Sequence, residues 1–480
     1  MQMTRNLLLK TDSYKLAHWA MYPENTDGVY SYMESRAGAA YPYTVFFGLQ
    51  YILKAHLAGN VFSRADVERA HALAAAHFGD GAVFNRDGWI ALHERHGGRL
   101  PLRIKAVAEG SVVPTGNVLM TVENTDPDFP WITNYVESLL THVWYPSTVA
   151  TRSHHALAMI ADHVRRTGGD PEVAKLMLHD FGYRGAAGDE AAALGGAGHL
   201  VNGLGTDTLA AMELLMSFYG AELDGLALSV PATEHSVMTA LGRDGEQQIV
   251  GKLLDGFPGG ILSVVGDSYD IYGFVESLGT RFRERVLARD GVLVVRPDSP
   301  TPAHPTPDAQ VLALVEQLER LFGATTNARG FKVLDPHVRV LWGDGLDEAM
   351  IEAILDRLSR GGYAAENVAT FGMGGGLLQK LDRDTQHFAF KSSAQSRGGA
   401  WHDISKVPLD QTKRSKAGRL KLVVDDGELT TVSESHPGED QLATVFENGQ
   451  LRGEATFADI RERAAGARAV AAALRSLRPA

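Results

Sequence analysis

The stretches ILSVVGDSYD (residues 261–270) and VLVVRPDSP (residues 292–300) decide the fold, because each joins a short run of Val, Ile and Leu to a polar tip. Nearly continuous runs of this kind are typical of strands that are covered on both faces, as in a parallel sheet. A segment with helical periodicity follows each tip. We therefore predict that the two stretches are successive strand–helix units.

The same design repeats outward from these two stretches, between residues 175 and 376. Successive tips lie about 30 residues apart, which is the length of a strand–helix–strand unit. One longer interval holds a proline-rich loop, a helix expected near residues 308–322 and a hairpin expected near Lys332. The remaining runs are KLMLHDFGYRG (175–185), HLVNGLGTD (199–207), LALSVPATEH (226–235), VRVLWGDGLD (338–347) and NVATFGMGGG (367–376).

Seven such runs in series favour a barrel over an open sheet. We expect an α/β fold in which residues 146–384 form an incomplete parallel (β/α) barrel of about seven strands. The flanks, residues 1–145 and 385–480, contain strand-like pieces, and a helix is expected over residues 456–475. The two flanks are predicted to form together one composite β-rich α+β domain.

The composition excludes several classes of protein. The chain has 480 residues, of which 46 are Lys or Arg and 58 are Asp or Glu, so its net charge of −12 disfavours nucleic acid or an anionic membrane as a partner. It has no cysteine, which excludes disulfides, thiolate nucleophiles and iron–sulfur clusters. No stretch approaches the length of a membrane helix, and the apolar run before Lys10 is too short for a signal peptide. We expect a cytoplasmic protein.

The loops that follow parallel strands converge on one face, so the polar tips are expected to form one pocket. Several carboxylates in one pocket can hold sugar hydroxyls, bind Mg²⁺ through water or stabilise a cationic transition state. The alternative is that each of them caps the helix that follows it. The tip residues are His179, Asp180, Arg184, Asp207, His235, Asp267, Arg296, Asp298 and Asp344.

Three further features each have more than one interpretation. The glycines in GMGGG (372–376) either cradle a phosphate at a helix start or simply form a tight turn. The basic residues between Lys406 and Lys421 are either a solvated face or a lid over a diphosphate. His235 is a structural histidine, a general base or a phosphate acceptor.

Twelve motifs in order along the chain resemble the nicotinamide phosphoribosyltransferase family. They are TDSYK (11–15), YSYMESR (30–36), FFGLQYIL (46–53), VENTDPDFPWITNYVE (122–137), HDFGYRG (179–185), GTDT (205–208), SVPATEHS (229–236), SVVGDSYDIY (263–272), RPDS (296–299), GDG (343–345), GGGLLQKLDRD (374–384) and KRSKAGRL (413–420). The resemblance covers nearly the whole chain.

The resemblance implies that a phosphoribosyl group passes from 5-phosphoribosyl-1-pyrophosphate to nicotinamide, giving nicotinamide mononucleotide and pyrophosphate in NAD salvage. It also implies Mg²⁺ as cofactor, ATP as an optional coupling substrate, and a homodimer whose two active sites each use both subunits.

The resemblance further implies roles for individual residues. Phe181 and the other subunit's copy of Tyr14 would sandwich the pyridine ring, with Arg184 beside it and Asp207 accepting a hydrogen bond from the carboxamide. His235 would accept phosphate from ATP. The pocket would be lined by Ser229, Val230 and Ser263, the ribose held by Asp298, Gly343 and Asp344, the 5′-phosphate by Gly374, Gly375 and Arg383, and the diphosphate faced by Arg36, His235, Arg296, Lys391, Lys406 and Lys413. We expect His235, Asp267, Arg296 and Asp298 to be catalytic, and Asp267 and Asp298 to bind the metal, through water.

Three alternatives stay open at this point. A nicotinate phosphoribosyltransferase would share the architecture, but an ionised Asp207 would repel the carboxylate of nicotinate. An inactive binding protein would be expected to have lost residues such as Asp207 or Arg383, and both are present. An aldolase barrel would need a lysine at a strand tip, and none of the seven runs carries one there.

Overall fold

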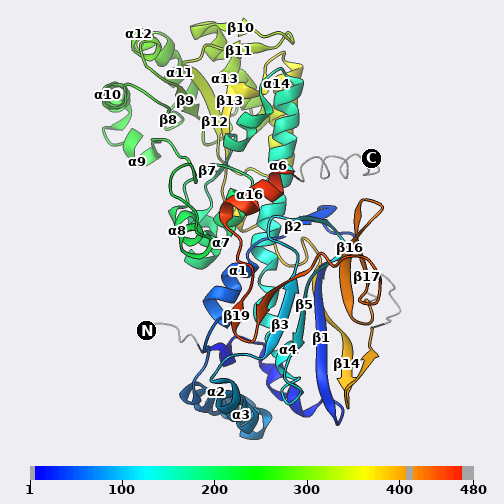
Figure 1. The fold of residues 1–480 in the computed structure, drawn as a ribbon. Helices are drawn as coiled ribbons and strands as arrows, with labels where there is room; N and C mark the ends of the chain where they lie inside the picture. Colours follow the sequence, from blue (N-terminus) through cyan, green and yellow to red (C-terminus); the bar gives the residue numbers. More distant parts are fainter. Residues whose placement is uncertain (1–5, 407–414, 467–480) are drawn as a thin grey trace. The chain divides into compact units, whose positions relative to one another are not determined.

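The computed structural model describes residues 6–406 and 415–466, and the chain divides into two compact units (Figure 1). Unit 1 takes in residues 1–151, 215–221 and 382–480, and unit 2 takes in residues 152–214 and 222–381. The boundaries expected from the sequence differ from these by a few residues, and residues 215–221 were expected in the other domain.

Unit 2 is built on a curled, six-stranded parallel sheet in the order β7-β6-β13-β12-β9-β8. The runs of Val, Ile and Leu form its strands, and the strand residues are almost all buried because both faces of the sheet are covered. The strands are β6 (Leu178–Asp180), β7 (Gly205–Thr206), β8 (Leu262–Val265), β9 (Leu293–Arg296), β12 (Val338–Trp342) and β13 (Val368–Met373).

The expected count of about seven strands was wrong by one, because the run over residues 226–235 does not form a strand. It makes two isolated parallel bridges instead, from Leu228 to Gly205 and from Ala232 to Ser263. Pro231 lies between them, and its missing N–H and fixed φ prevent a continuous ladder. The run thus joins the two edge strands, β7 and β8, without completing a seventh strand.

The expected helix and hairpin of the long interval are both present. Helix α13 (Pro307–Phe322) buries Val311, Leu314, Val315 and Leu318, which share one helical face. Strands β10 (Ala324–Thr326) and β11 (Lys332–Leu334) form the hairpin. The other helices of this part are η5 (Pro171–Leu176), η6 (Tyr183–Gly185), α7 (Asp189–Leu200), α8 (Leu209–Tyr219, which ends in unit 1), α9 (His235–Met238), α10 (Gly242–Gly256), α11 (Ile271–Gly279), α12 (Arg283–Leu287), α14 (Glu348–Arg360), η7 (Ala365–Asn367) and α15 (Gly375–Leu378).

Unit 1 contains a seven-stranded antiparallel sheet in the order β15-β14-β1-β5-β3-β18-β19, so strands from both ends of the chain lie side by side. Its strands are β1 (Thr26–Ser35), β3 (Leu102–Ala106), β5 (Val118–Asn124), β14 (Phe388–Arg397), β15 (Ala400–Asp403), β18 (Ala443–Glu447) and β19 (Gln450–Leu451). Two smaller sheets pair β2 (Tyr43–Val45) with β4 (Val112–Pro114) and β16 (Leu420–Asp425) with β17 (Glu428–Ser433).

The helices of unit 1 are short, apart from α2, α3 and α16. Within residues 6–406 and 415–466, no helix is long and apolar enough to cross a membrane. The helix expected over residues 456–475 is present as far as residue 466, and its remainder lies outside the described residues. The helices are η1 (Leu7–Leu9), η2 (Ser13–Ala20), α1 (Leu49–Ile52), η3 (Leu53–Leu57), α2 (Arg64–Phe78), η4 (Gly81–Val83), α3 (Arg86–His96), α4 (Ile132–Tyr135), α5 (Glu137–Thr141) and α16 (Phe457–Gly466), while α6 (Trp144–Arg166) belongs partly to each unit.

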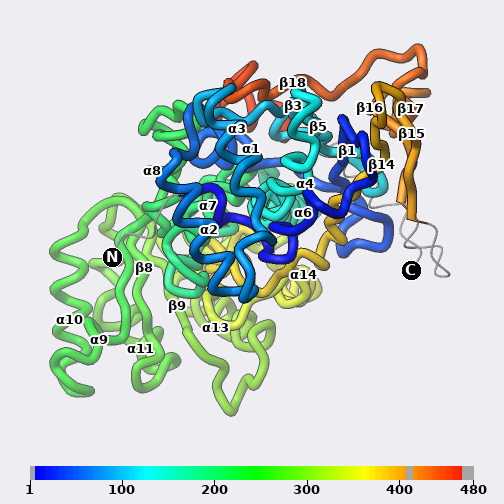
Figure 2. Tube along the Cα trace, turned by 90° about the horizontal axis from the view of Figure 1, so that it is seen from below, coloured from blue at the N-terminus to red at the C-terminus, as the bar shows by residue number. Residues whose placement is uncertain are grey.

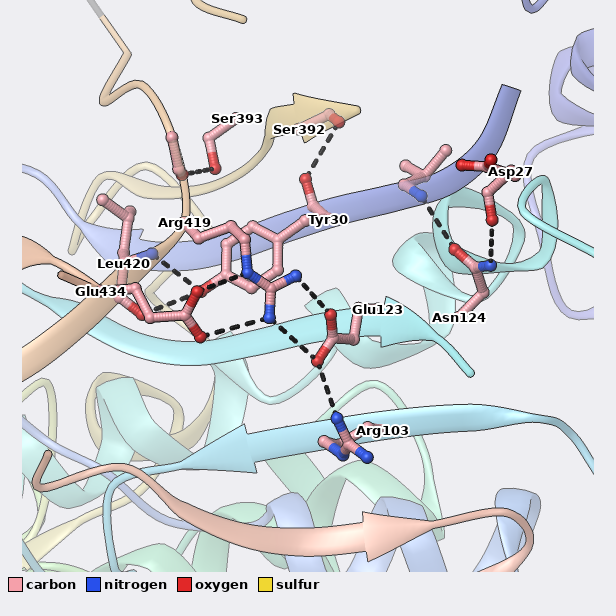
Figure 3. Close-up of polar contacts among 12 residues, drawn as sticks. Asp27, Tyr30, Arg103, Glu123, Asn124, Ser392, Ser393, Arg419, Leu420 and Glu434 are labelled. Atoms are coloured by element: carbon pink, nitrogen blue, oxygen red, sulfur yellow. Dashed lines mark hydrogen bonds and ion pairs between the residues drawn. The ribbon is translucent and has the colours of Figure 1, made fainter. Parts of the chain in front are cut away.

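Two members of the basic stretch after Lys406 support the fold of unit 1. Arg419 donates to Glu123 at 2.6 Å and to Glu434 at 2.6 Å, and its guanidinium lies over the ring of Tyr30 (Figure 3). Lys416 donates to the carbonyl of Gly116 at 2.7 Å and pairs with a buried glutamate. These two cations are therefore occupied by internal ion pairs.

Candidate active site

The strand tips of unit 2 form two groups of polar side chains, and the first is centred on Asp207. This residue follows β7, and its Oδ1 receives hydrogen bonds from His179 Nε2 at 2.9 Å and from Ser229 Oγ at 2.6 Å. Burial favours the neutral acid, but these two hydrogen bonds and the nearby charge of Arg296 outweigh it and lower the pKa of Asp207. Asp207 is thus an ionised acceptor whose Oδ1 is already occupied.

Phe181 lies beside this group, at the end of β6. Its ring packs edge-on against His179, with the ring centroids 5.2 Å apart, and the guanidinium of Arg296 lies 5.5 Å from its centroid. A Cβ at Gly372 would lie 2.0 Å from this ring, and one at Gly343 would lie 3.2 Å away. Glycine at both positions therefore gives the aromatic ring its place, which the sequence did not indicate for Gly372.

The second group is centred on Asp267, which follows β8 and has an almost fully buried side chain. One carboxylate oxygen pairs with His235 Nε2 at 2.9 Å, and the other accepts from the backbone N–H of Asp298 at 2.8 Å and from Ser299 Oγ at 3.1 Å. Arg296 donates to Asp298 Oδ1 at 2.9 Å. Asp267 therefore holds the loop that carries Asp298 next to His235.

None of the three candidate carboxylates caps the helix that follows it. Helix α11 is capped by Asp270, and α14 is capped by Asp347. Helix α13 begins after Thr306. The capping alternative is therefore wrong for Asp267, Asp298 and Asp344, which leaves all three for a different role.

The turn after β12 is held by a buried tryptophan. The indole N–H of Trp342 donates to the carbonyl of Asp344 at 2.7 Å, and the side chain of Trp342 is fully buried. Gly343 and the exposed Asp344 are thus presented on a fixed turn. After β13, Gly374 precedes the four-residue helix α15, and a Cβ at Gly185 would lie 3.2 Å from the backbone nitrogen of Gly375. Gly185 therefore packs closely against the glycine turn, while a Cβ at Gly375 would meet no atom within 4 Å.

Four of the remaining candidates lie outside these hydrogen-bonded groups. Arg184 lies on η6 and is exposed, and Val230 lies beside Ser229 on the irregular run 226–235. The hydroxyl of Ser263 on β8 is buried and has no hydrogen-bond partner among the described residues. Asp180 is fully buried, and burial raises the pKa of its carboxyl. It accepts from the backbone N–H of Gly182 at 2.7 Å, so it supports the loop that follows Phe181.

Four of the cationic candidates, Arg36, Arg383, Lys391 and Lys406, lie in unit 1. Lys391 on β14 is paired with Tyr32 of β1, and Arg36 directly follows β1. Burial lowers the pKa of Lys391, the charge of Glu137 opposes this, and the positive charges of Arg36, Lys406 and Arg383 lower the pKa further. Three other predicted diphosphate and phosphate ligands of unit 1 are therefore near enough to Lys391 to act on its charge. Lys413 lies outside the described residues.

Tyr14 is an exposed aromatic side chain on a firmly held segment of unit 1. It is 59% exposed, and the residues around it are fastened by bonds from Thr11 Oγ1 to the carbonyl of Tyr135 at 2.8 Å and from Lys15 Nζ to Glu137 at 2.9 Å. An aromatic ring that is fixed in place and left in solvent is typical of a residue that contacts a ligand or another chain.

The strand-tip carboxylates of the described residues are too few to hold a metal ion by themselves. Within the described parts of the chain, no group of three or more His, Asp or Glu side chains could hold a metal ion. Both oxygens of Asp267 are occupied by internal hydrogen bonds, whereas Asp298 Oδ2 has only a weak approach from His235 Nδ1 at 3.9 Å. Mg²⁺ is commonly bound by one or two carboxylates together with substrate phosphates and water. Asp298 fits that pattern better than Asp267.

Comparison with known families gives two matches that together span most of the chain. The family described as the Nicotinate phosphoribosyltransferase (NAPRTase) family matches residues 176–450. The Nicotinamide phosphoribosyltransferase N-terminal domain matches residues 6–104.

Two curated relatives are similar over nearly their whole length. The chain is 48% identical over 476 residues to a nicotinamide phosphoribosyltransferase of Xanthomonas campestris pv. campestris, covering 96% of this chain and 99% of the relative. It is 33% identical over 496 residues to a nicotinamide phosphoribosyltransferase of Acinetobacter baylyi, covering 96% and 97%.

Two solved structures share the fold. One is a nicotinate-nucleotide pyrophosphorylase from Pyrococcus furiosus, with a TM-score of 0.62, 16% identity and coverage of 100% of this chain and 99% of that one. The other is human nicotinic acid phosphoribosyltransferase, with a TM-score of 0.54, 18% identity and coverage of 95% and 92%.

Proposed function

The chain belongs to the nicotinamide phosphoribosyltransferase family, and we propose that its strand-tip residues transfer a phosphoribosyl group from 5-phosphoribosyl-1-pyrophosphate to nicotinamide. The products are nicotinamide mononucleotide and pyrophosphate, and the reaction belongs to NAD salvage. The observation that carries the assignment of residues is Asp207: both protein donors bind its Oδ1, so Oδ2 is left to accept from a carboxamide N–H.

Asp207 also favours nicotinamide over nicotinate. Its hydrogen bonds keep it ionised, and a second carboxylate facing it would be repelled, whereas an amide N–H donates to it. Phe181 offers a ring face for the pyridine, and the unpartnered hydroxyl of Ser263 is a further group that can bind the substrate. Arg184, Ser229 and Val230 complete this end of the site.

At the other end, Asp298 and Asp344 would bind the ribose, and Gly343, Gly374 and Gly375 leave room for the sugar and its phosphate. Loss of pyrophosphate leaves positive charge on the ribose ring, so a nearby carboxylate lowers the barrier by charge stabilisation and positioning. Arg296 would stabilise the charge on the leaving pyrophosphate. Asp267 would keep Asp298 and His235 in place, since both of its oxygens are bound to that loop and that ring.

Bound Mg²⁺ would neutralise charge on the pyrophosphate, and the uncommitted Oδ2 of Asp298 is the group of this chain that suits it. His235 is 46% exposed at the side chain and faces Asp267 and Asp298, so it is accessible to a phosphate donor. We propose that ATP phosphorylates His235 and thereby assists turnover, because added negative charge next to the arginines would strengthen their contacts.

We propose a homodimer in which unit 1 of one copy completes the site of the other. The fixed, exposed ring of Tyr14 and the cationic side chains of Arg36, Arg383, Lys391 and Lys406 support this proposal, because they have the chemistry to bind a pyridine and a diphosphate. Arg36 Nε is buried without a hydrogen-bond partner in the described residues. Lys413 is also proposed to bind the diphosphate.

The decisive experiment incubates the pure protein with phosphoribosyl pyrophosphate, Mg²⁺ and either nicotinamide or nicotinate, and measures the mononucleotide by chromatography. We expect nicotinamide mononucleotide in the first reaction and little product in the second. Efficient product formation only from nicotinate would contradict the assignment of Asp207.

A further inference from the structure

We propose that Gln310 and Tyr272 are positioning residues that hold the loop carrying Asp298, and so set the affinity for phosphoribosyl pyrophosphate. The proposal rests on the function proposed above. Neither residue takes part in the proposed chemistry.

The loop after β9 makes a turn of its own, in which the N–H of His304 donates to the carbonyl of Thr301 at 3.0 Å, but Asp298 and Ser299 lie outside that turn. Prolines stand at positions 297, 300, 302 and 305 of this loop, and Pro307 begins α13. Proline has no N–H to donate, so these positions cannot donate to a continuous ladder or helix. The conformation of Asp298 and Ser299 therefore depends on side chains that reach the loop from elsewhere.

Gln310 provides the first of these attachments. Its side chain is fully buried on α13. Its Oε1 accepts both donors of Thr301, the backbone N–H at 3.0 Å and the hydroxyl at 2.8 Å. Its Nε2 donates to the hydroxyl of Tyr272 at 3.0 Å.

Tyr272 provides the second attachment. Its hydroxyl contacts Thr301 Oγ1 at 3.2 Å and His304 Nδ1 at 2.5 Å, so it reaches the loop at two points. The carbonyl of Tyr272 accepts from Gln317 Nε2 at 2.9 Å. Gln310 and Gln317 are two turns apart on α13 and therefore share a face, with which they hold both ends of the tyrosine. Figures 1 and 2 show α11, which carries Tyr272, beside α13.

The loop is thus fastened at both ends. Asp267 binds Asp298 and Ser299 at the end facing the site, and Gln310 and Tyr272 bind Thr301 at the far end. Asp207 is held by different donors, His179 and Ser229. Loss of the Gln310 attachment should therefore disturb the sugar end of the site and leave the pyridine end in place.

The test measures steady-state kinetics of Gln310→Leu and Tyr272→Phe with each substrate varied in turn. We expect KM for phosphoribosyl pyrophosphate to rise about tenfold and kcat to fall, while KM for nicotinamide stays within about twofold. Gln310→Glu keeps an acceptor for Thr301 and should restore most of the affinity. The matched control is Tyr363→Phe, which removes a buried hydroxyl that pairs with Glu319 in the same unit, away from the strand tips.

Each outcome decides the proposal. Equal shifts of both KM values, or no shift of either in a folded variant, would overturn it. If Gln310→Leu does not fold, as judged by circular dichroism, Tyr272→Phe carries the test, because it removes a single oxygen atom. A wild-type protein that forms no mononucleotide would refute the proposed function, whereas an active wild type with unselective variants would refute only the positioning role.

Discussion

The two ends of the strand-tip site are held in place by different means. At the proposed pyridine end, Asp207 and its donor His179 lie on or directly next to parallel strands, which the backbone ladder fixes. At the proposed sugar end, Asp298 lies on a proline-rich loop to which the side chains of Asp267, Gln310 and Tyr272 are bonded. The first end needs few supporting side chains, whereas the second needs several that are remote from it in sequence.

The two ends should therefore respond differently to mutation. Ladder hydrogen bonds come from the backbone and survive most substitutions, whereas a loop held by side chains loses its geometry when one of them is removed. We therefore expect variants at the pyridine end to change selectivity, and variants at the sugar end to change catalysis itself.

The largest effect is expected from breaking the sugar end. Asp298→Ala should lower kcat/KM about 10²- to 10³-fold, because a preorganised charge next to the developing positive charge is lost.

Arg383→Ala should be comparably inactive if Arg383 serves the site of the other copy. Mixing the two variants under conditions of subunit exchange should restore up to about half of the wild-type activity, since one site of each heterodimer is then intact.

Tyr363→Phe is the control for this mixture, because exchange of this variant with wild type should leave both sites of each dimer intact. Subunit exchange is verified by native mass spectrometry with a tagged copy. Exchange without recovery of activity would place all the catalytic residues in one chain.

The next effect concerns the pyridine end. Asp207→Asn should weaken use of nicotinamide and raise relative use of nicotinate, because a charge-assisted hydrogen bond contributes roughly 1.5–3 kcal/mol, or about ten- to a hundredfold in relative efficiency. The measurement is the ratio of kcat/KM for the amide and the acid. An unchanged ratio would remove Asp207 from substrate selection.

A smaller effect is expected at His235, which lies next to Asp267 and Asp298. His235→Ala should lose the stimulation by ATP and retain part of the basal synthesis, because the proposed phosphate adds charge near the pyrophosphate without performing the transfer. Mass spectrometry of protein incubated with ATP should detect an acid-labile phosphate on His235. A variant that still responds to ATP would disprove the role.

The smallest effect is expected in the pH dependence of stability. The pKa of Asp207 is lowered, although burial opposes this, because His179 and Ser229 donate to the carboxylate and Arg296 is nearby. A carboxylate with a lowered pKa stabilises the fold fully above its ordinary pKa, near 3.8, and loses that contribution as the pH falls through the lowered value. The stability difference between wild type and Asp207→Asn should therefore be constant from about pH 5 to 8 and shrink only in stronger acid, as measured by urea unfolding.

The sequence predicted the parallel sheet of unit 2, since runs of Val, Ile and Leu at regular spacing leave few other arrangements. The expected positions of α13 and of the hairpin at Lys332 were confirmed. The strand count was wrong because the run over residues 226–235 contains Pro231, whose effect on pairing depends on which neighbours flank it. Local pattern does not reveal those neighbours.

For the site, the sequence by itself determined which residue types stand at the strand tips. The loops that follow parallel strands converge on one face, so the sequence also brought these residues to one edge of the sheet. It did not determine which oxygen of Asp207 is occupied, that Gly372 makes room for Phe181, or that Gln310 holds Thr301. Those facts depend on side chains from separate elements meeting at hydrogen-bond distance, and only the tertiary structure sets such distances. The physical reason is that a strand's direction follows from local pattern, whereas the environment of a single atom follows from everything packed around it.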